Sequence, residues 1–359
     1  MRLGVLFFLV VGACVAVVES SRGSFYYVND SVTTGDVYCS VAGHSTNTGT
    51  SADSPKSSLQ QIIAGFVLTG GDTIYVDTGL YTNESYSLYN EGGTSSSDLV
   101  IQGSTNYNAG GTVFNRNDSG QVVFYIRGSY ISLRDLTLQG GGYGLFTEFG
   151  YYIKASRLRI VGNAVHGIYD GESSTWILDN CLFADNTLGV TVLASDWAFN
   201  NCLFFNNGIH INRRSALSTT TSRNCIFIGG VSYGGVGGIP AGDYNTYWNT
   251  TLGGRYACVS DLGQAHSTWL SPLFISSTNL DFHEKSIVGR WDGTNWVKDS
   301  VHSPSIDLGD PSSVYASEIP PHGSNINVGI YGNTKDASQS RTNAWLLALT
   351  FNDGGAVNG

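Results

Sequence analysis

Apolar residues recur along the middle of the chain with a step of 21 to 23 residues. The step is clearest in three tetrapeptides that share their first residue, an asparagine, and their last, a phenylalanine. They are Asn180-Cys181-Leu182-Phe183, Asn201-Cys202-Leu203-Phe204 and Asn224-Cys225-Ile226-Phe227. A repeat of this length, rich in strand formers and glycine, is typical of a solenoid in which each repeat is one coil and equivalent residues stack on one another.

Aligning the repeats gives three apolar columns. The anchor column is Leu136, Leu158, Cys181, Cys202 and Cys225. Two residues later in each repeat stand Leu138, Ile160, Phe183, Phe204 and Phe227, and five residues before the anchor stand Ile131, Ile153, Trp176, Trp197 and Thr220. Because side chains alternate between the faces of a strand, these columns are predicted to point inward. The same alternation predicts an outward column of Ser132, Lys154, Ile177, Ala198 and Thr221.

A further strand is predicted after a glycine in four repeats. These glycines are Gly144, Gly167, Gly189 and Gly208. Two residues after them stand Phe146, Tyr169, Thr191 and His210, which are expected to form a second outward column. No stretch of this region has the pattern of a long amphipathic helix. The sequence therefore favours an all-β fold, a single-stranded parallel β-helix, over a solenoid that alternates strands with helices.

Three asparagines lie five residues after the anchor of their repeat: Asn163, Asn186 and Asn207. Stacked asparagines at a coil corner can hydrogen-bond along the axis, and asparagine tolerates the left-handed backbone that a tight corner needs. This predicted ladder resembles the one in right-handed β-helices of the pectate-lyase superfamily. The resemblance implies a right-handed coil.

The first part of the chain is expected to cap the solenoid. It combines a Tyr26-Tyr27-Val28 strand, a polar loop ending at Pro55 and apolar residues at helical spacing within residues 57–66. A first inner strand at residues 72–76 follows. A helix here would cover an open core and unpaired strand edges. This order resembles the amino-terminal signature of secreted bacterial β-helix proteins, among them alginate- and chondroitin-lyase-like proteins.

The end of the chain contains a block at residues 303–311 and another at residues 325–334. Together they resemble the carboxy-terminal closing segment of the same secreted families. We therefore expect a β-helix domain over residues 23–340, with the coils running from Asp72 to Asn249. Residues 341–359 are expected to be a tail or the start of a further domain.

Residues 1–22 have the pattern of an export signal, with Arg2 before an apolar run too short to span a bilayer. Two processing routes are open. The sequence Val11-Gly12-Ala13-Cys14 resembles a permissive bacterial lipobox, which would place a lipid anchor on Cys14. Cleavage near residues 19–23 would instead release a soluble protein. Either route predicts a secreted or cell-surface protein, and an outer-membrane lipoprotein in the first case.

The formal net charge of −10 argues against binding to nucleic acid or to anionic membranes by the whole surface. The charge is uneven, because residues 116–223 carry nine Lys and Arg residues against eight Asp and Glu residues. The body of the solenoid is thus nearly neutral, and the excess acid lies in the flanks.

The repeat cysteines are predicted to be buried free thiols rather than disulfide partners. Adjacent coils are separated by about 4.8 Å, whereas bonded cysteines bring their Cβ atoms to about 3.8 Å. A zinc site is not expected, because no histidine shares the cysteine column. Pairing of Cys39 with Cys258 is open, but nothing in the sequence requires it.

The second outward column and its neighbours supply the candidate binding residues. Aromatic rings in register offer a surface for sugar rings, and nearby polar groups offer hydrogen bonds to hydroxyls or carboxylates. The expected substrate-binding residues are Phe146, Glu148, Tyr169, His210, Asn212 and Arg213. Asp170 is unusual, because alternation directs it inward. It is expected either to sit at a solvated coil corner or to have a functional role.

Lyases with this fold use Lys or Arg to abstract a proton from uronate and to neutralise its charge, so the resemblance implies a basic site. The candidate catalytic residues are Lys154, Arg159, Asp170, His210 and Arg213. The chain lacks the Arg-x-x-Arg-x-Pro of pectate lyases, the Asp-Pro-His-Asp of mannuronan epimerases and the paired aspartates of polygalacturonase-like hydrolases. No cluster of three acidic residues suggests a calcium cage, so no cofactor is expected, and calcium is left open without an evident set of ligands.

Two function classes remain. The first is a non-catalytic protein that binds extracellular or cell-surface polysaccharide, which the missing motifs favour. The alternative is a polysaccharide lyase acting by β-elimination on an acidic glycan such as alginate, pectate or a glycosaminoglycan. In both cases the partner is a polysaccharide and the protein is expected to be a monomer.

Overall fold

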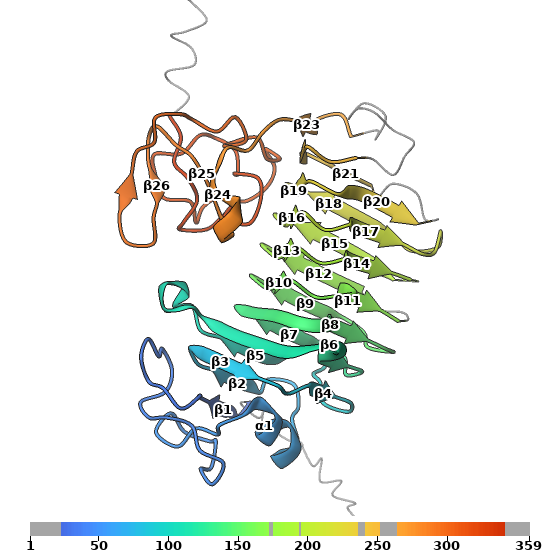
Figure 1. Cartoon of the computed structure of the whole chain (residues 1–359), viewed down its shortest axis with the longest axis vertical. Coiled ribbons are helices and arrows are strands. Elements are labelled where there is room, and N and C mark those ends of the chain that lie inside the picture. The colour runs from blue at the N-terminus through green and yellow to red at the C-terminus, as the bar shows by residue number, and fades with distance from the viewer. Residues whose placement is uncertain (1–22, 172–174, 194, 236–240, 252–263, 342–359) are drawn as a thin grey trace, which may run out of the picture.

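The computed structural model describes residues 23–171, 175–193, 195–235, 241–251 and 264–341. Two long parallel sheets wind around a common core as a right-handed β-helix (Figure 1). Each full coil contributes one strand to the first sheet and a bent pair of strand segments to the second. The expected fold class is therefore confirmed.

Sheet A holds the strands that precede the anchor column. Its members, in spatial and chain order, are β1 (Phe25–Val28), β2 (Thr73–Val76), β5 (Leu99–Gly103), β7 (Ile131–Arg134), β9 (Ile153–Ser156), β12 (Thr175–Asp179), β15 (Asp196–Asn200), β18 (Thr220–Arg223) and β21 (Ala241–Asp243). Every pair in this sheet is parallel and in register, as for Ile153, Trp176 and Trp197.

Sheet B forms the other two sides of the coil, which we call the middle leg and the third leg. The middle leg consists of β3 (Gly79–Thr82), β10 (Arg159–Val161), β13 (Leu182–Ala184), β16 (Leu203–Phe205), β19 (Ile226–Ile228), β22 (Thr246–Trp248) and β23 (Thr268–Trp269). The third leg consists of β4 (Tyr86–Leu88), β11 (His166–Asp170), β14 (Leu188–Val192), β17 (Ile209–Arg213) and β20 (Val231–Gly235). Two longer strands, β6 (Thr112–Ile126) and β8 (Leu136–Thr147), run through both legs.

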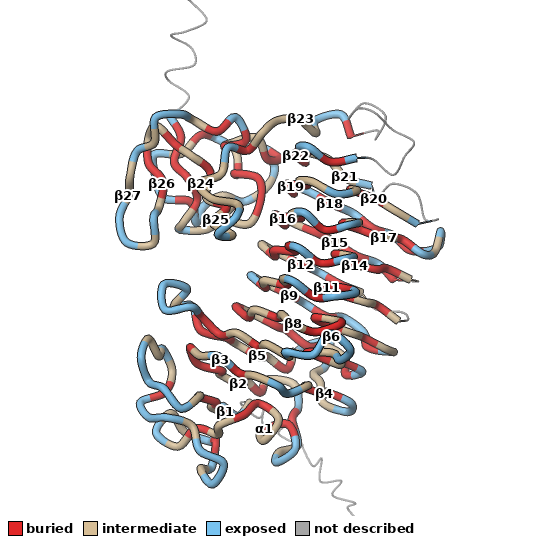
Figure 2. Tube along the Cα trace, in the orientation of Figure 1, coloured by how far each residue is buried: buried red, intermediate tan, exposed pale blue. Residues whose placement is uncertain are grey.

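The predicted inward columns form the core. Phe183, Phe204 and Phe227 lie in register on successive coils, with centroids 4.8 and 4.9 Å apart and nearly parallel rings. Trp176 and Trp197 are buried and stack with centroids 4.7 Å apart. Buried segments recur in every coil, while exposed residues concentrate at turns and loops (Figure 2). The alternating apolar positions in the sequence are thus the residues that form the core.

The repeat cysteines are free and fully buried, as expected. The Cys202 backbone N–H donates to Cys225 Sγ at 3.4 Å, and each thiol lies against a backbone carbonyl of a neighbouring strand. Cys39 is also buried and free. Cys14 and Cys258, for which a lipid anchor and a disulfide were considered, lie outside the described residues.

One predicted outward residue is buried. Ser132 is only 2% exposed, whereas Lys154, Ile177 and Thr221 of the same column are exposed. The reason is local, because Arg134 donates from Nε to Ser132 Oγ at 2.9 Å and its side chain lies across the serine. A long neighbour on the same strand therefore covers a short side chain that itself points outward.

The asparagine ladder is present. Asn186 donates from its backbone N–H and its side-chain amide to Asn207 Oδ1, each at 3.0 Å. Asn163 donates in the same way to Asn186 Oδ1, and Asn163 Oδ1 accepts from the Gly141 N–H. All three asparagines are at most 2% exposed. Each buried amide hydrogen-bonds both to the next coil and to the backbone, and these bonds hold the corner in one register.

The left-handed backbone lies elsewhere than expected. The ladder asparagines have ordinary backbone angles, and the left-handed residue precedes each of them: Gly162, Asp185 and Asn206, with φ of 62°, 55° and 51°. A second left-handed position precedes the anchor and is occupied by Asp135, Arg157, Asn180, Asn201, Asn224 and Tyr244. The ladder asparagines are thus selected for their hydrogen bonds, and the residues before them for backbone tolerance.

The amino-terminal cap is built as predicted. Helix α1 (Leu59–Gly65) begins after Ser58, whose Oγ accepts from the Gln60 N–H at 3.1 Å. Leu59, Ile62 and Ile63 are buried in the main core cluster, so the helix closes the first coil. The coils themselves begin earlier than Asp72, because β1 already pairs with β2. They continue past Asn249, because β23 pairs with β22.

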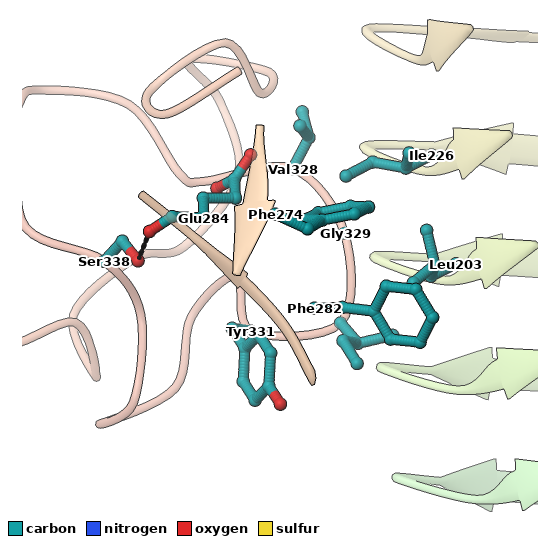
Figure 3. A pocket seen from close by; sticks show the side chains of 10 residues that line it. Leu203, Ile226, Phe274, Phe282, Glu284, Val328, Gly329, Tyr331 and Ser338 are labelled. Atoms are coloured by element: carbon teal, nitrogen blue, oxygen red, sulfur yellow. Dashed lines mark hydrogen bonds between the residues drawn. The ribbon is translucent and has the colours of Figure 1, made fainter. Parts of the chain in front are cut away.

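The last part of the described chain packs against the side of the solenoid (Figure 1). It contains β24 (Phe274–Ser276), β25 (Asp281–Glu284), β26 (Arg290–Trp291), β27 (Trp296–Val297) and the 3₁₀ turn η3 (Ser277–Asn279). Another 3₁₀ turn, η1 (Tyr107–Ala109), lies in the loop between β5 and β6. We call residues 274–341 the carboxy-terminal segment. Phe274 and Phe282 point at Leu203 and Ile226 on the outer face of the middle leg (Figure 3). The gap left there is only about 10 Å³, so this contact is closely packed.

Asparagine amides fix the same contact. Asn180 Nδ2 donates to the carbonyls of Ile330 and Gly332, each at 2.9 Å. Asn201 Nδ2 donates to the carbonyls of Asn327 and Gly329 at 2.8 and 3.2 Å. These are the asparagines of the repeated tetrapeptides. Their left-handed backbone therefore points a row of amides outward, where the carboxy-terminal segment provides the acceptors.

None of the helices in the described ranges is long and apolar enough to cross a membrane.

We predict that Cys202→Asp destabilises the protein far more than Ala198→Asp. The first substitution places a carboxylate without a partner in a fully buried column, a cost on the order of 3–5 kcal/mol. The second lies in the outward column of sheet A, where a charge stays hydrated. Thermal unfolding of both variants beside the wild type measures the difference. Equal melting temperatures would contradict the orientation of the two columns.

We also predict that stability falls as the pH rises, through Glu284. Burial first, and then the charges of Glu318 and Asp307, raise the pKa of this carboxyl to about 8, although a hydrogen bond from Ser305 opposes the shift. The unfolded chain releases this proton near pH 4.3, and the folded protein keeps it. The stability that comes from keeping this proton is therefore fully present below that pH and is lost as the pH approaches 8.

Denaturant unfolding of wild type and Glu284→Gln between pH 4 and 8 provides the measurement. The amide cannot ionise, so the variant should lose much less stability over this range. Glu318 retains part of the slope in both proteins, because burial also raises its pKa to about 7. Identical slopes in the two proteins would refute the assignment to Glu284.

Candidate functional site

Three aromatic residues on the third leg form a continuous stack, which we call the aromatic column: Tyr125 on β6, Phe146 on β8 and Tyr169 on β11. They are direct partners in the parallel register. The ring centroids are 5.5 and 5.1 Å apart and the planes differ by only 16° and 17°. Each ring is half-buried because its neighbours cover much of its faces. The column therefore presents mainly ring edges and phenol hydroxyls to solvent.

A second pair of rings borders the column. Tyr143 and His166 are register partners three residues earlier on the same strands and stack with centroids 5.2 Å apart. Both meet Tyr169 edge to face, at 6.0 and 4.9 Å. On the other side, Tyr89 packs against Tyr125 at 5.3 Å. The aromatic surface thus extends over four coils.

Polar groups continue the column where the aromatic residues stop. Thr191 takes the position after Tyr169, and Asn212 the position after Thr191. Asn212 Nδ2 donates to Thr191 Oγ1 at 3.3 Å, and Thr191 Oγ1 lies 3.0 Å from His166 Nδ1. At the opposite end, the Tyr125 hydroxyl donates to Glu148 Oε2. Hydrogen-bonding groups therefore flank the rings at both ends.

His166 is neutral in this setting. Burial, and secondarily the positive charge of Arg214, lower the pKa of its imidazole to about 4. Arg214 itself is exposed at the end of β17, and its guanidinium has no ion pair within the described part of the chain. The end of the column thus combines an uncharged imidazole with a hydrated cation.

The sequence prediction placed Phe146 and Tyr169 in one outward column, and the structure has them there. The same prediction was wrong for His210. The register pairs Leu188 with Ile209, so His210 is level with Gly189 and two positions away from the column. Asn212 occupies the place expected for His210. Aligning the repeats on Gly208 introduced the error, because the register makes Gly208 level with Thr187 and not with Gly189.

His210 instead lies in the core, fully buried at the end of the asparagine ladder. Asn207 Nδ2 donates to its Nδ1 at 3.1 Å, and its Nε2–H donates to the Gly229 carbonyl at 2.8 Å. Both ring nitrogens are used by a neutral imidazole, and burial lowers its pKa to about 4. The next coil has Gly230 at the ladder position, so the histidine ends the ladder that an asparagine would otherwise continue.

Two further candidates are structural rather than exposed. Arg213 is 7% exposed, and its guanidinium donates to the Ser218 carbonyl. Asp170 is completely buried, with Thr147 Oγ1 and Ser195 Oγ donating to its carboxylate. The expectations of a ligand-facing Arg213 and of a solvated corner at Asp170 are therefore both wrong. Alternation directs both residues inward, and the hydroxyls of adjoining turns satisfy them.

The basic candidates lie on other faces of the solenoid. Lys154 is on sheet A, where its Nζ lies 2.8 Å from Asp98 Oδ2. Arg159 is on the middle leg, and its Nη2 donates to the Leu280 carbonyl of the carboxy-terminal segment at 3.2 Å. The two side chains are therefore neither near each other in register nor part of the aromatic column.

Sequence reasoning missed Tyr89, Tyr125, Tyr143 and His166. A signal for two of them was present, since Tyr125 precedes Phe146 by 21 residues and Tyr143 precedes His166 by 23. Both steps match the repeat. Among the described residues there is no group of three or more His, Cys, Asp or Glu side chains placed to hold a metal ion.

Comparisons with known proteins agree with this architecture. Residues 88–238 match the family described as "Right handed beta helix region". Residues 242–309 match the family described as "Disaggregatase related". No curated protein sequence matches the chain significantly.

Among solved structures, pectate lyase Pel9A is similar over 86% of this chain and 96% of its own, with a TM-score of 0.51 and 15% identity. An alginate lyase from Paenibacillus sp. str. FPU-7 is similar over 53% of this chain and 73% of its own, with a TM-score of 0.41 and 15% identity. A mannuronic acid specific polysaccharide family 6 lyase from human gut microbiota covers 53% of this chain and 51% of its own, with the same TM-score and identity. From the winding of the coils, the family match over residues 88–238 and the likeness to the pectate lyase structure, the chain has a right-handed parallel β-helix fold.

Proposed function

We propose that the protein binds polysaccharide on the third leg, along the aromatic column. The observation that carries this proposal is the register of Tyr125, Phe146 and Tyr169, which repeats an aromatic edge on three successive coils. A glycan is a polymer of repeated rings, so a surface with a repeated contact is suited to it. Ring edges and hydroxyls offer both apolar contact and hydrogen bonds to such a chain.

Polar groups at the two ends add specificity. Glu148 is an acceptor for sugar hydroxyls, and the Asn212 amide and the Arg214 guanidinium are donors. The strongly lowered pKa of His166 is the kind of perturbation that concentrates at functional sites. A pectate lyase is among the proteins that share this fold, which supports a polysaccharide as the ligand class.

Binding without catalysis is the function that the geometry supports best. A lyase needs a base and a charge-neutralising group beside one sugar unit. Of the five candidates, His210, Asp170 and Arg213 are buried, Lys154 is paired with Asp98, and Arg159 lies against the carboxy-terminal segment. These five candidates therefore do not form the assembled set of groups that the lyase alternative requires.

The proposed ligand is an extracellular or cell-surface polysaccharide. This part of the proposal rests on the export signal expected at residues 1–22, which lie outside the described residues. Whether Cys14 carries a lipid anchor decides between a released and an anchored protein, and mass spectrometry of the mature protein separates the two. Under either outcome we propose that the protein is a monomer and binds the polysaccharide with its third leg.

We predict that Tyr169→Ala lowers glycan affinity at least tenfold. The substitution removes the ring that contacts Phe146, Tyr143 and His166. Tyr169→Phe keeps the ring and loses only the hydroxyl, so it should retain part of the affinity. Because aromatic pairs contribute about 0.5–1.5 kcal/mol each, the alanine variant should also melt at a lower temperature. Co-sedimentation with alginate, pectate, chondroitin sulfate and neutral glycans provides the measurement.

A matched control is Tyr27→Ala. Tyr27 is also half-buried and stacks on Tyr75, with centroids 5.6 Å apart, but it lies on sheet A. It should lose comparable stability and keep full binding. A glycan bound equally well by wild type and Tyr169→Ala would show that the face is wrong. Release of unsaturated sugar products, detected by ultraviolet absorbance in the same incubations, would instead support the lyase.

A further inference from the structure

The carboxy-terminal segment and the solenoid have separate apolar clusters. The buried residues inside the coils form one cluster. A second cluster joins Leu182, Leu203 and Ile226, on the outer face of the middle leg, to the carboxy-terminal segment. The segment contributes Phe282 and Val328 as its buried members. Because regions with separate apolar clusters can open independently, the segment can leave the middle leg without unfolding the coils.

A buried carboxyl lies at this contact. Glu284 follows Phe282 by two residues on β25, so both side chains lie on the same face of the strand. Both line the small gap beside Leu203 and Ile226 (Figure 3). Glu284 is only 5% exposed, and it forms no ion pair with a Lys or Arg among the residues that the structure describes. Tyr331, which lines the same gap, stays neutral because burial raises the pKa of its phenol.

The other ionisable groups around Glu284 oppose its ionisation. Glu318 and Asp307 lie within the same segment and are close enough to repel a charge on Glu284. His302 and His322 act on Asp307, and His322 also acts on Glu318. The solenoid contributes only aliphatic side chains to the gap. An ionised Glu284 would therefore face an apolar surface on one side and two acids on the other, which is unfavourable on both sides.

Glu318 also closes the loop that the solenoid holds. Its Oε1 accepts from the backbone N–H groups of Asn327 and Asn333, each at 2.9 Å. Its Oε2 is buried and has no hydrogen-bond partner within the described ranges. The loop between these two N–H groups supplies the carbonyls that accept from Asn180 and Asn201. The carboxyl that repels Glu284 thus also shapes the docking loop, which couples the charge to the contact.

We propose that ionisation of Glu284 releases the carboxy-terminal segment from the middle leg while the coils stay folded. The segment is then a pH-sensitive cover, which hides Leu203 and Ile226 when it is docked and uncovers them when it leaves. The cover lies on the middle leg and the proposed glycan site on the third leg, so this inference does not rest on the function proposed above.

The direction of the switch follows from the two states of the carboxyl. Burial raises the pKa of Glu284 to about 8 in the docked protein, whereas a carboxyl in water releases its proton near pH 4.3. Docking is therefore strongest below that pH. Between the two values, the ratio of docked to undocked protein should fall by up to about tenfold per pH unit.

Hydrogen exchange of the full chain, read by mass spectrometry, tests the proposal. The reporter is the peptide over residues 325–334, in which the Gly329 N–H donates to the Asn224 carbonyl of the solenoid at 2.8 Å. Wild type and Glu284→Gln are compared at the same pH, so the intrinsic pH dependence of exchange cancels. The amide of the variant keeps an acceptor for Ser305 and cannot ionise. We expect the wild-type rate, divided by that of the variant, to rise at least tenfold between pH 5 and 8.

Two controls separate release of the segment from general unfolding. Peptides over β12 and β15 of sheet A should exchange equally in both proteins. Asp292→Asn, at an exposed carboxylate of the same segment, should follow wild type. A ratio that stays constant with pH, or coils that lose protection together with the segment, would overturn the proposal.

Gly332→Ala provides the undocked reference. A Cβ at this glycine would meet Asn201 Nδ2 at 2.0 Å, so the docking loop should exchange rapidly at both pH values while sheet A stays protected. A loop that remains protected in this variant would show that it does not hold the segment, and would also refute the cover.

Discussion

The structure depends on one constraint, the register of parallel hydrogen bonds between successive coils. Because each residue lies over its equivalent one coil earlier, any side chain repeated at this step becomes a continuous column. Inside, the constraint produces the stacked phenylalanines and tryptophans and the buried thiols. Outside, it produces the stack of Tyr125, Phe146 and Tyr169. Core and surface are thus consequences of the same ladder.

The corners keep that register from slipping, and asparagine acts there in two ways. Asn163, Asn186 and Asn207 point inward and bond from coil to coil, so a shift by one residue would leave buried amides unsatisfied. Asn180 and Asn201 sit at left-handed positions and point outward to carbonyls of the carboxy-terminal segment. The same residue type thus fixes the stacking in one place and attaches a lateral segment in another.

The aromatic column belongs to both structure and surface. Tyr169 contacts Phe146, Tyr143 and His166, so its ring contributes to stability as well as to any contact with a ligand. The rings cover one another, which leaves edges and hydroxyls rather than open faces for a glycan. A ligand would therefore meet a preformed and rigid surface, with little ordering cost on the protein side.

The sequence by itself determined whatever repeats. The step of 21 to 23 residues was enough for the coil, the inward columns, the ladder and the pairing of Phe146 with Tyr169, because register converts sequence period directly into contact. Tertiary structure decided what does not repeat. Gly208 lies two positions earlier in its coil than Gly189 does in the preceding coil, so the parallel register places His210 in the core and Asn212 in the outward column. Asn180 meets the carbonyl of Ile330, 150 residues away, through a segment with no period of its own. Such contacts depend on the packing of distant surfaces, which local alternation and spacing do not report.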